Sequence, residues 1–117
     1  MPAAHSLADA YNEPAKAREV IRQAIDDPAN QDRVRMAVVT LFADAFNEKD
    51  LALRALERSV IQLKNTQALW FPYRAGMRND PAFKALLRAT GLADYFRTSG
   101  NWGDFCKPVG ADDFECR

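Results

Sequence analysis

Two cysteines carry the most definite chemistry that this sequence of 117 residues offers. Cys106 and Cys116 are its only cysteines, and both lie in a segment rich in glycine and acidic residues at the end of the chain. The pair is compatible with a disulfide and equally with two unreacted thiols. A zinc site is not expected, because zinc needs four ligands and only His5 could join the two cysteines.

An enzyme is not predicted, because no group of side chains has the spacing that catalysis requires. The sequence has no glycine-rich phosphate-binding motif, and Cys106 has no activating base near it in sequence. The adjacent acids Asp26-Asp27 and Asp112-Asp113 are expected to be solvated, because neighbouring side chains do not converge. We therefore expect neither a cofactor nor a metal ion.

A cluster of aromatic and arginine side chains is the strongest candidate for partner binding. Trp70, Tyr73, Arg74 and Arg78 belong to residue types that are enriched at the centres of protein interfaces. We predict that these four residues contact a partner. The alternative is that Trp70 and its neighbour Phe71 pack in the core.

The charge of the chain is balanced in total and uneven along its length. The formal net charge is +0, while basic residues prevail in 51–100 and acidic residues prevail in 1–50 and 101–117. A zero net charge argues against direct contact with nucleic acid. No apolar run approaches the ~20 residues that span a bilayer, so membrane insertion is not expected.

Two similar heptapeptides indicate an internal repeat. Residues 7–13 read LADAYNE, and residues 42–48 read FADAFNE. A period close to 34 residues with helical spacing is typical of tetratricopeptide-like helix pairs. We therefore predict an all-α fold over residues 1–98, a tetratricopeptide-like array of about three antiparallel helix pairs whose first pair is truncated.

Hydrophobic spacing and capping signals predict helices and no β-sheet. The predicted helices span residues 4–11, 14–26, 29–46, 49–64, 67–78, 81–90 and 92–98. Asp27-Pro28 and Asp80-Pro81 are typical helix starts, since the aspartate caps and the proline loses no hydrogen bond. One apolar stripe is expected to be core, and it consists of Val34, Ala37, Val38, Leu41, Ala45 and Phe46.

Residues 99–117 are predicted to form an irregular tail that caps the helical array. The tail contains three aromatic residues, Trp102, Phe105 and Phe114, and disordered segments are usually poor in aromatic residues. Terminal repeats leave an apolar face open, so we expect these three residues to anchor the tail on the last repeat. The acidic tail also complements the basic stretch before it.

The stretch NDPAFKALLRATGLADYFRTSGNWGDFC, residues 79–106, resembles the C-terminal end of tetratricopeptide-like regions in proteobacterial regulatory proteins. Those regulators carry a winged-helix DNA-binding domain or a nucleotide cyclase domain ahead of the repeats. The matching residues are Asp80, Pro81, Phe83, Leu86, Leu87, Gly91, Leu92, Tyr95, Gly100, Asp104, Phe105 and Cys106. Ala82, Phe96 and Gly103 depart from the arginine, tryptophan and proline of the family pattern.

The resemblance implies a sensory or interaction region rather than a DNA-binding or cyclase activity. We therefore predict a protein-interaction module that binds a protein or peptide partner. The alternative is a ligand- or redox-responsive domain acting through the tail that contains Cys106 and Cys116. Some relatives carry this region in the periplasm, so a disulfide would indicate that compartment and free thiols the cytoplasm.

Overall fold

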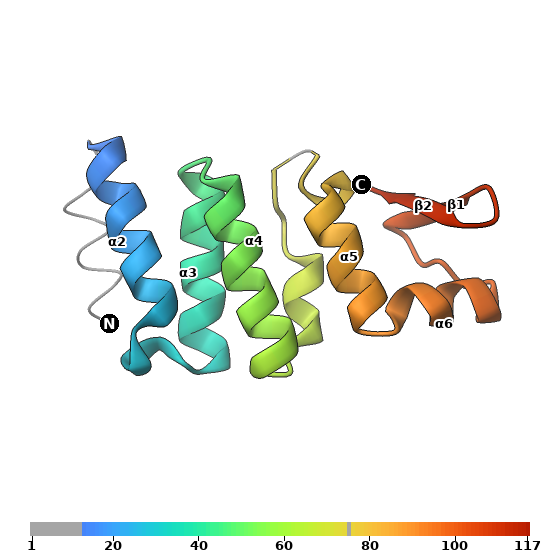
Figure 1. The fold of residues 1–117 in the computed structure, drawn as a ribbon, viewed down its shortest axis with the longest axis horizontal. Helices are drawn as coiled ribbons and strands as arrows, with labels where there is room; N and C mark the ends of the chain where they lie inside the picture. The colour runs from blue at the N-terminus through green and yellow to red at the C-terminus, as the bar shows by residue number, and fades with distance from the viewer. Residues whose placement is uncertain (1–12, 75) are drawn as a thin grey trace. The chain divides into compact units, whose positions relative to one another are not determined.

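The computed structural model describes residues 13–74 and 76–117, so the helix predicted over 4–11 lies outside the described residues (Figure 1). The chain divides into two compact units, Met1–Tyr73 and Arg74–Arg117. The sequence places the boundary at residue 98 instead. In the structure, the last two helices belong to the same unit as the tail.

Helices account for most of the described residues, which confirms an all-α protein at this coarse level. The described elements of the first unit are the α-helices α2 (Pro14–Asp26), α3 (Arg33–Ala45) and α4 (Lys49–Glu57), the 3-10 turns η1 (Pro28–Asn30) and η3 (Thr66–Trp70), and the π-helical turn η2 (Arg58–Gln62). Within residues 13–74 and 76–117, no helix combines the length and apolar character that crossing a bilayer requires.

Side-chain caps decide where the helices of the first unit begin. Asp27 Oδ1 accepts a hydrogen bond of 2.9 Å from the backbone N–H of Ala29, as the sequence predicts, but the capped segment is only the short turn η1. Asp32 Oδ1 accepts a second one of 2.8 Å from the backbone N–H of Arg35. The helix predicted over 29–46 therefore begins only at Arg33, because Asp32 is the N-cap residue of α3.

A short connection joins α3 to α4 and makes them antiparallel neighbours. Asn47 adopts a left-handed conformation with φ of 59°, which asparagine tolerates better than most residues. Figure 1 shows α2, α3 and α4 side by side in the first unit. The predicted turn at Asn47 and Glu48 is thus confirmed.

One face of each helix supplies the core of the first unit. The buried apolar residues are Ala17, Ile21, Ala24 and Ile25 of α2, Met36, Val39 and Ala43 of α3, Leu51, Ala52, Ala55 and Leu56 of α4, and Val60, Ala68 and Leu69 after it. The alanines among them let the helices approach closely.

The core prediction for α3 was wrong, because the helix buries its other side. Val34 is 74% exposed and Leu41 is 37% exposed, and Val38 is only half-buried. The buried residues are instead Met36, Val39, Thr40, Ala43 and Asp44. Both sides of α3 have apolar residues at helical spacing, so periodicity alone did not distinguish them.

The helix predicted over 67–78 was also wrong. The described part of that range holds only two short 3-10 turns, η3, which ends at Trp70, and the start of a second one at Met77–Asn79. Pro72 disfavours a helical conformation for the residue before it, and Phe71 is extended with ψ of 160°. Gly76 then takes a left-handed conformation with φ of 86°, which ends any continuation.

The second unit combines two helices with a β-hairpin. Its described elements are the 3-10 turn η4 (Met77–Asn79), the α-helices α5 (Pro81–Ala89) and α6 (Leu92–Ser99), and the strands β1 (Cys106–Val109) and β2 (Asp113–Cys116). The two predicted helices are confirmed: Asp80 Oδ1 caps α5 through the backbone N–H of Ala82 at 2.9 Å, and Gly91 is left-handed between α5 and α6.

The prediction of an irregular tail without a sheet was wrong. β1 and β2 pair antiparallel, with Cys106 opposite Cys116 and Val109 opposite Asp113. Each strand has only four residues, which is too short to show an alternating pattern. Pro108 is compatible with β1 because a two-stranded sheet consists of edge strands.

A matched pair of substitutions tests which side of α3 is buried. Val39→Ala removes fully buried methyl groups and should lower the free energy of unfolding by about 1.5–3 kcal/mol. Val34→Ala makes the same chemical change at a mostly exposed site and should change it by less than about 0.5 kcal/mol. Urea unfolding at low protein concentration, followed by circular dichroism, compares the two variants. Equal losses of unfolding free energy would contradict the assignment of the buried side of α3.

Candidate functional site

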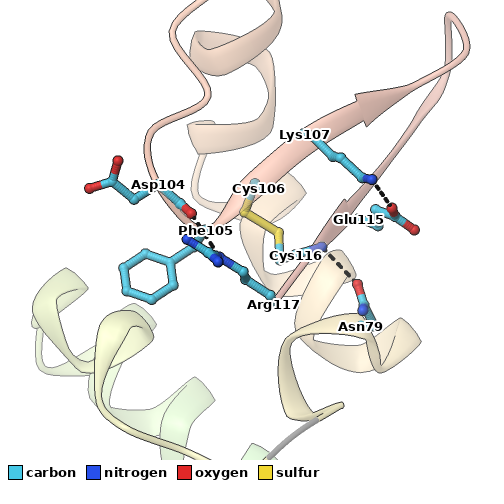
Figure 2. A pocket seen from close by; sticks show the side chains of 8 residues that line it. All are labelled: Asn79, Asp104, Phe105, Cys106, Lys107, Glu115, Cys116 and Arg117. Atoms are coloured by element: carbon cyan, nitrogen blue, oxygen red, sulfur yellow. Dashed lines mark hydrogen bonds and ion pairs between the residues drawn. A yellow bond between two sulfur atoms is a disulfide. The ribbon is translucent and has the colours of Figure 1, made fainter.

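The disulfide between Cys106 and Cys116 is the centre of the second unit's most distinctive surface. The two cysteines face each other across the hairpin, with 4.0 Å between their Cα atoms, and both side chains are buried. Figure 2 shows the bond at the open end of the hairpin, where β1 begins and β2 ends. Of the two states that the sequence leaves open, the structure therefore has the disulfide.

Hydrogen bonds hold the open end of the hairpin in place. The backbone N–H of Cys116 donates to Asn79 Oδ1 at 2.7 Å, which ties β2 to η4. Arg117 donates from its backbone N–H to the Phe105 carbonyl at 2.8 Å and from Nε to the Asp104 carbonyl at 3.1 Å. The disulfide is thus surrounded by contacts from both strands and from the turn before α5.

A cleft of about 340 Å³ lies beside the disulfide. It is lined by Asn79, Asp104, Phe105, Cys106, Lys107, Glu115, Cys116 and Arg117 (Figure 2). Lys107 Nζ and Glu115 Oε1 form a cross-strand ion pair of 2.8 Å, and this carboxylate raises the pKa of Lys107. The cleft is therefore lined by both acidic and basic side chains, and the reactive group beside it is the buried disulfide.

Aromatic rings pack the hairpin against the two helices of its unit. Phe114 of β2 is buried, and its ring centroid lies 5.9 Å from that of Trp102, which lies 5.7 Å from Phe96 of α6. Lys84 and Arg88 of α5 place their charges 5.6 Å and 5.0 Å from the centroid of the Phe114 ring. These cation–π contacts cover the ring that the hairpin inserts.

The predicted tail anchors take two different positions. Trp102 and Phe114 form the aromatic contact with α5 and α6, and Arg97 lies 5.3 Å above the Trp102 ring. Phe105 is 38% exposed, and the guanidinium of Arg78 lies 4.6 Å above its ring. Phe105 therefore borders the cleft rather than filling the core.

Asp113 is the ionic link between β2 and α5. Its Oδ1 lies 3.2 Å from Lys84 Nζ and 3.3 Å from Arg88 Nη2, and it accepts a hydrogen bond of 2.8 Å from the backbone N–H of Phe114. The Phe114 N–H and the Lys84 ammonium stabilise the charged carboxylate and hold the pKa of Asp113 below its usual value.

The four residues predicted to bind a partner are divided between the units. Trp70 and Tyr73 belong to the first unit, and Arg74 and Arg78 to the second. Tyr73 is buried, and its hydroxyl donates to the Ala68 carbonyl. Arg78 is buried as well and donates to the Arg117 carbonyl at 3.1 Å, so Tyr73 and Arg78 have structural roles.

The exposed side of α3 is a candidate contact surface, although its hydrophobic spacing predicted that it would be part of the core. Val34, Val38 and Leu41, here called the α3 stripe, follow one another at i, i+4 and i+7. At 100° per residue they lie opposite Met36, Val39 and Ala43. The signal in the sequence was the absence of any charged residue from Met36 to Ala43, which leaves no polar side for solvent.

Charged side chains of the first unit gather on α2 and α4 instead. Arg18 of α2 pairs with Glu48 at 2.6 Å and Asp50 at 2.9 Å, at the start of α4. Asp26 pairs with Arg54 at 2.6 Å and with Arg58 at 2.9 Å. The hydrogen bond from Arg58 is the main reason that the pKa of Asp26 is lowered. These helices therefore present an internally paired, hydrated surface.

Metal binding finds no support in the described part of the chain, where no three His, Cys, Asp or Glu side chains gather. His5 lies outside that part. No protein-family model matches the chain, and neither the characterised proteins nor the solved structures with which it was compared provide a match. The site must therefore be interpreted from its own chemistry.

The hydrogen bond from the Phe114 N–H and the ion pairs of Asp113 should make the stability of the second unit sensitive to acid. Because the pKa of Asp113 is lowered in the folded state, its contribution is present above its ordinary value of about 3.9 and is lost as the pH falls through the lower folded value. Asp113→Asn should therefore flatten the loss of stability between about pH 5 and pH 2. Urea unfolding at each pH, followed by the fluorescence of Trp102 and Trp70, measures how the free energy of unfolding depends on pH.

Asp112→Asn is the matched control, because Asp112 is the exposed neighbour in the hairpin turn and the change in net charge is identical. It should leave the acid dependence close to that of the unaltered protein. If both variants flattened the pH dependence of stability equally, the net charge of the chain, rather than the contacts with Lys84 and Arg88, would determine that dependence.

Proposed function

We propose that the chain is a protein-interaction module of a bacterial signalling or transcription regulator and that the α3 stripe is its contact surface. The observation that carries this proposal is the 74% exposure of Val34 on the side of α3 opposite its buried face. The assignment to a regulator rests on the resemblance of residues 79–106 to the ends of such proteins.

The α3 stripe differs from ordinary surface exposure of apolar residues. Single exposed apolar side chains are common in soluble proteins and need no explanation. Val34, Val38 and Leu41 instead form a continuous line on one helix, and a helix that is apolar on both sides is normally covered on both. Recognition of an apolar helical segment laid along such a line is an established mode of protein binding.

The contrast with the rest of the first unit supports the same proposal. Arg18 is already paired with Glu48, and Asp26 with Arg58, so that surface has little to gain from a partner. The α3 stripe gains by being removed from water, because burial of apolar area is the main source of binding energy.

Photo-crosslinking followed by reconstitution tests this role. A photoreactive amino acid at Leu41 should capture a protein in the native host, whereas the same group at exposed Gln23 of α2 should not. The captured protein, once purified, should bind the unaltered chain at least about tenfold more tightly than it binds Leu41→Glu. Gln23→Glu adds the same charge elsewhere and should bind like the unaltered chain.

Equal capture from both positions, or equal binding by both variants, would contradict the proposed contact surface. Circular dichroism of each variant should match that of the unaltered chain, since both positions are exposed. That control separates a lost contact from a lost fold.

A redox-responsive role is the second candidate, and the disulfide favours it. Units of fewer than about 50 residues rarely fold on a hydrophobic core alone, and Arg74–Arg117 is of that size. Closing the short loop between Cys106 and Cys116 contributes about 3 kcal/mol by restricting the unfolded chain. Reduction should therefore unfold the second unit and leave the first intact.

Hydrogen exchange across a series of thiol–disulfide buffers tests the redox role. Protection of 77–117 should disappear when the bond is reduced, while protection of 14–62 should persist. Cys106→Ser/Cys116→Ser should reproduce the reduced state and no longer respond to the buffer. A reduction potential above about −300 mV fits a switch, whereas a lower one would show that the bond is a permanent structural link.

A further inference from the structure

We propose that the α3 stripe is covered by the α3 stripe of a second copy of this chain, in an antiparallel arrangement about a twofold axis. The inference rests on the proposed role of the stripe as a contact surface and names its occupant. The neutrality of the stripe, the charges at its two ends and the symmetry that these impose support it.

The stripe itself is free of charge, which suits an identical surface. α3 has no charged residue between Met36 and Ala43, so nothing on the stripe selects a basic or an acidic partner. An identical stripe is equally apolar and has the same length, about 10 Å from Val34 to Leu41 at 1.5 Å per residue. The formal net charge of the chain is +0, so two copies do not repel each other.

The two ends of α3 carry opposite charge. Arg33 and Arg35 open the helix, and Glu48 and Asp50 follow its end. Arg33 directs its guanidinium to the carbonyls of Leu63 and Lys64 at 2.9 Å and 3.1 Å, so its charge meets no carboxylate there. An antiparallel pair places each basic end beside the acidic end of the other copy, whereas a parallel pair would place like charges together.

The other charged groups at these ends reduce this attraction. Arg35 is paired with Asp32 at 2.6 Å, Arg18 is shared between Glu48 and Asp50, and Lys49 lies between these two acids in the sequence. The helix dipoles act in the same direction as the end charges, because antiparallel helices bring the positive N-terminus of one beside the negative C-terminus of the other. The helix ends therefore mainly determine the orientation of the two copies, and the apolar stripe determines their affinity for each other.

The twofold axis would pass between Val38 and Leu41. In the antiparallel register, Val38 of one copy lies opposite Leu41 of the other, and Val34 lies opposite Ala45. The small side chain of Ala45 allows the backbones to approach as in other close helix pairs. One helix per copy buries less area than a stable dimer needs, so association should be weak and should depend on protein concentration.

Sedimentation equilibrium of the whole chain at concentrations up to about 1 mM tests the inference. The unaltered protein should pass from monomer to dimer within that range. Leu41→Glu and Val38→Lys should each remain monomeric, because each places two unpaired charges in the symmetric interface. Gln23→Glu, which changes the charge of exposed α2 and not of α3, should dimerise normally.

Mixing the variants tests the antiparallel register. A mixture of Leu41→Glu with Val38→Lys should recover dimer, because one glutamate then faces one lysine and the second pair is native. A mixture of Leu41→Glu with Leu41→Lys should recover less, because those positions do not face each other. Circular dichroism spectra that match the unaltered chain confirm that each variant is folded.

A monomer at every concentration would overturn the inference. Dimers that persist in both single variants would place the interface elsewhere and overturn it as well. Better recovery by Leu41→Glu with Leu41→Lys would overturn the antiparallel register. Capture of a foreign protein from Leu41 by a monomeric chain would uphold the interaction role and reject self-association.

Discussion

The packing of α3 against α2 and α4 is the interaction on which the first unit depends. Met36, Val39 and Ala43 supply its buried side, and the alanines of α4 let the two helices approach closely. Because an α-helix has 3.6 residues per turn, burying that side turns Val34 and Leu41 to solvent. The contact that stabilises the unit therefore also creates its most unusual surface.

The second unit meets a different constraint, because it is too small to depend on apolar burial alone. Phe83, Leu87 and Phe114 are its largest fully or almost fully buried side chains. The disulfide limits the freedom of the unfolded hairpin, and the cations of α5 and α6 cover the aromatic rings from above. A covalent bond and a few charged contacts thus supply what a larger core would provide.

Charge and apolar surface are separated in the first unit, and this separation is the basis for interpreting its function. The exposed ion pairs of Arg18 and Asp26 contribute little stability individually, but they keep α2 and α4 hydrated. α3 has no such groups along its middle. Of the four predicted contact residues, Tyr73 and Arg78 are buried and hydrogen-bonded within their own units.

Local signals in the sequence determined where several helices begin and end. The caps of Asp32 and Asp80 and the left-handed Gly91 act on backbone groups only a few residues away, so the helices 81–90 and 92–98 could be predicted. The presence of a cysteine pair and of aromatic tail residues was equally visible. Even there, the break before Asp32 was missed, because two capping aspartates compete within a few residues.

Tertiary structure alone decided which side of α3 is buried, that Cys106 and Cys116 are bonded across a hairpin, and that the units divide at Tyr73. The physical reason is that hydrophobic spacing specifies a helix but not the neighbour it faces, and α3 is apolar on both sides. Likewise, strands of four residues are held as a hairpin in part by contacts with Asn79, Lys84 and Arg88, which lie far from them in sequence.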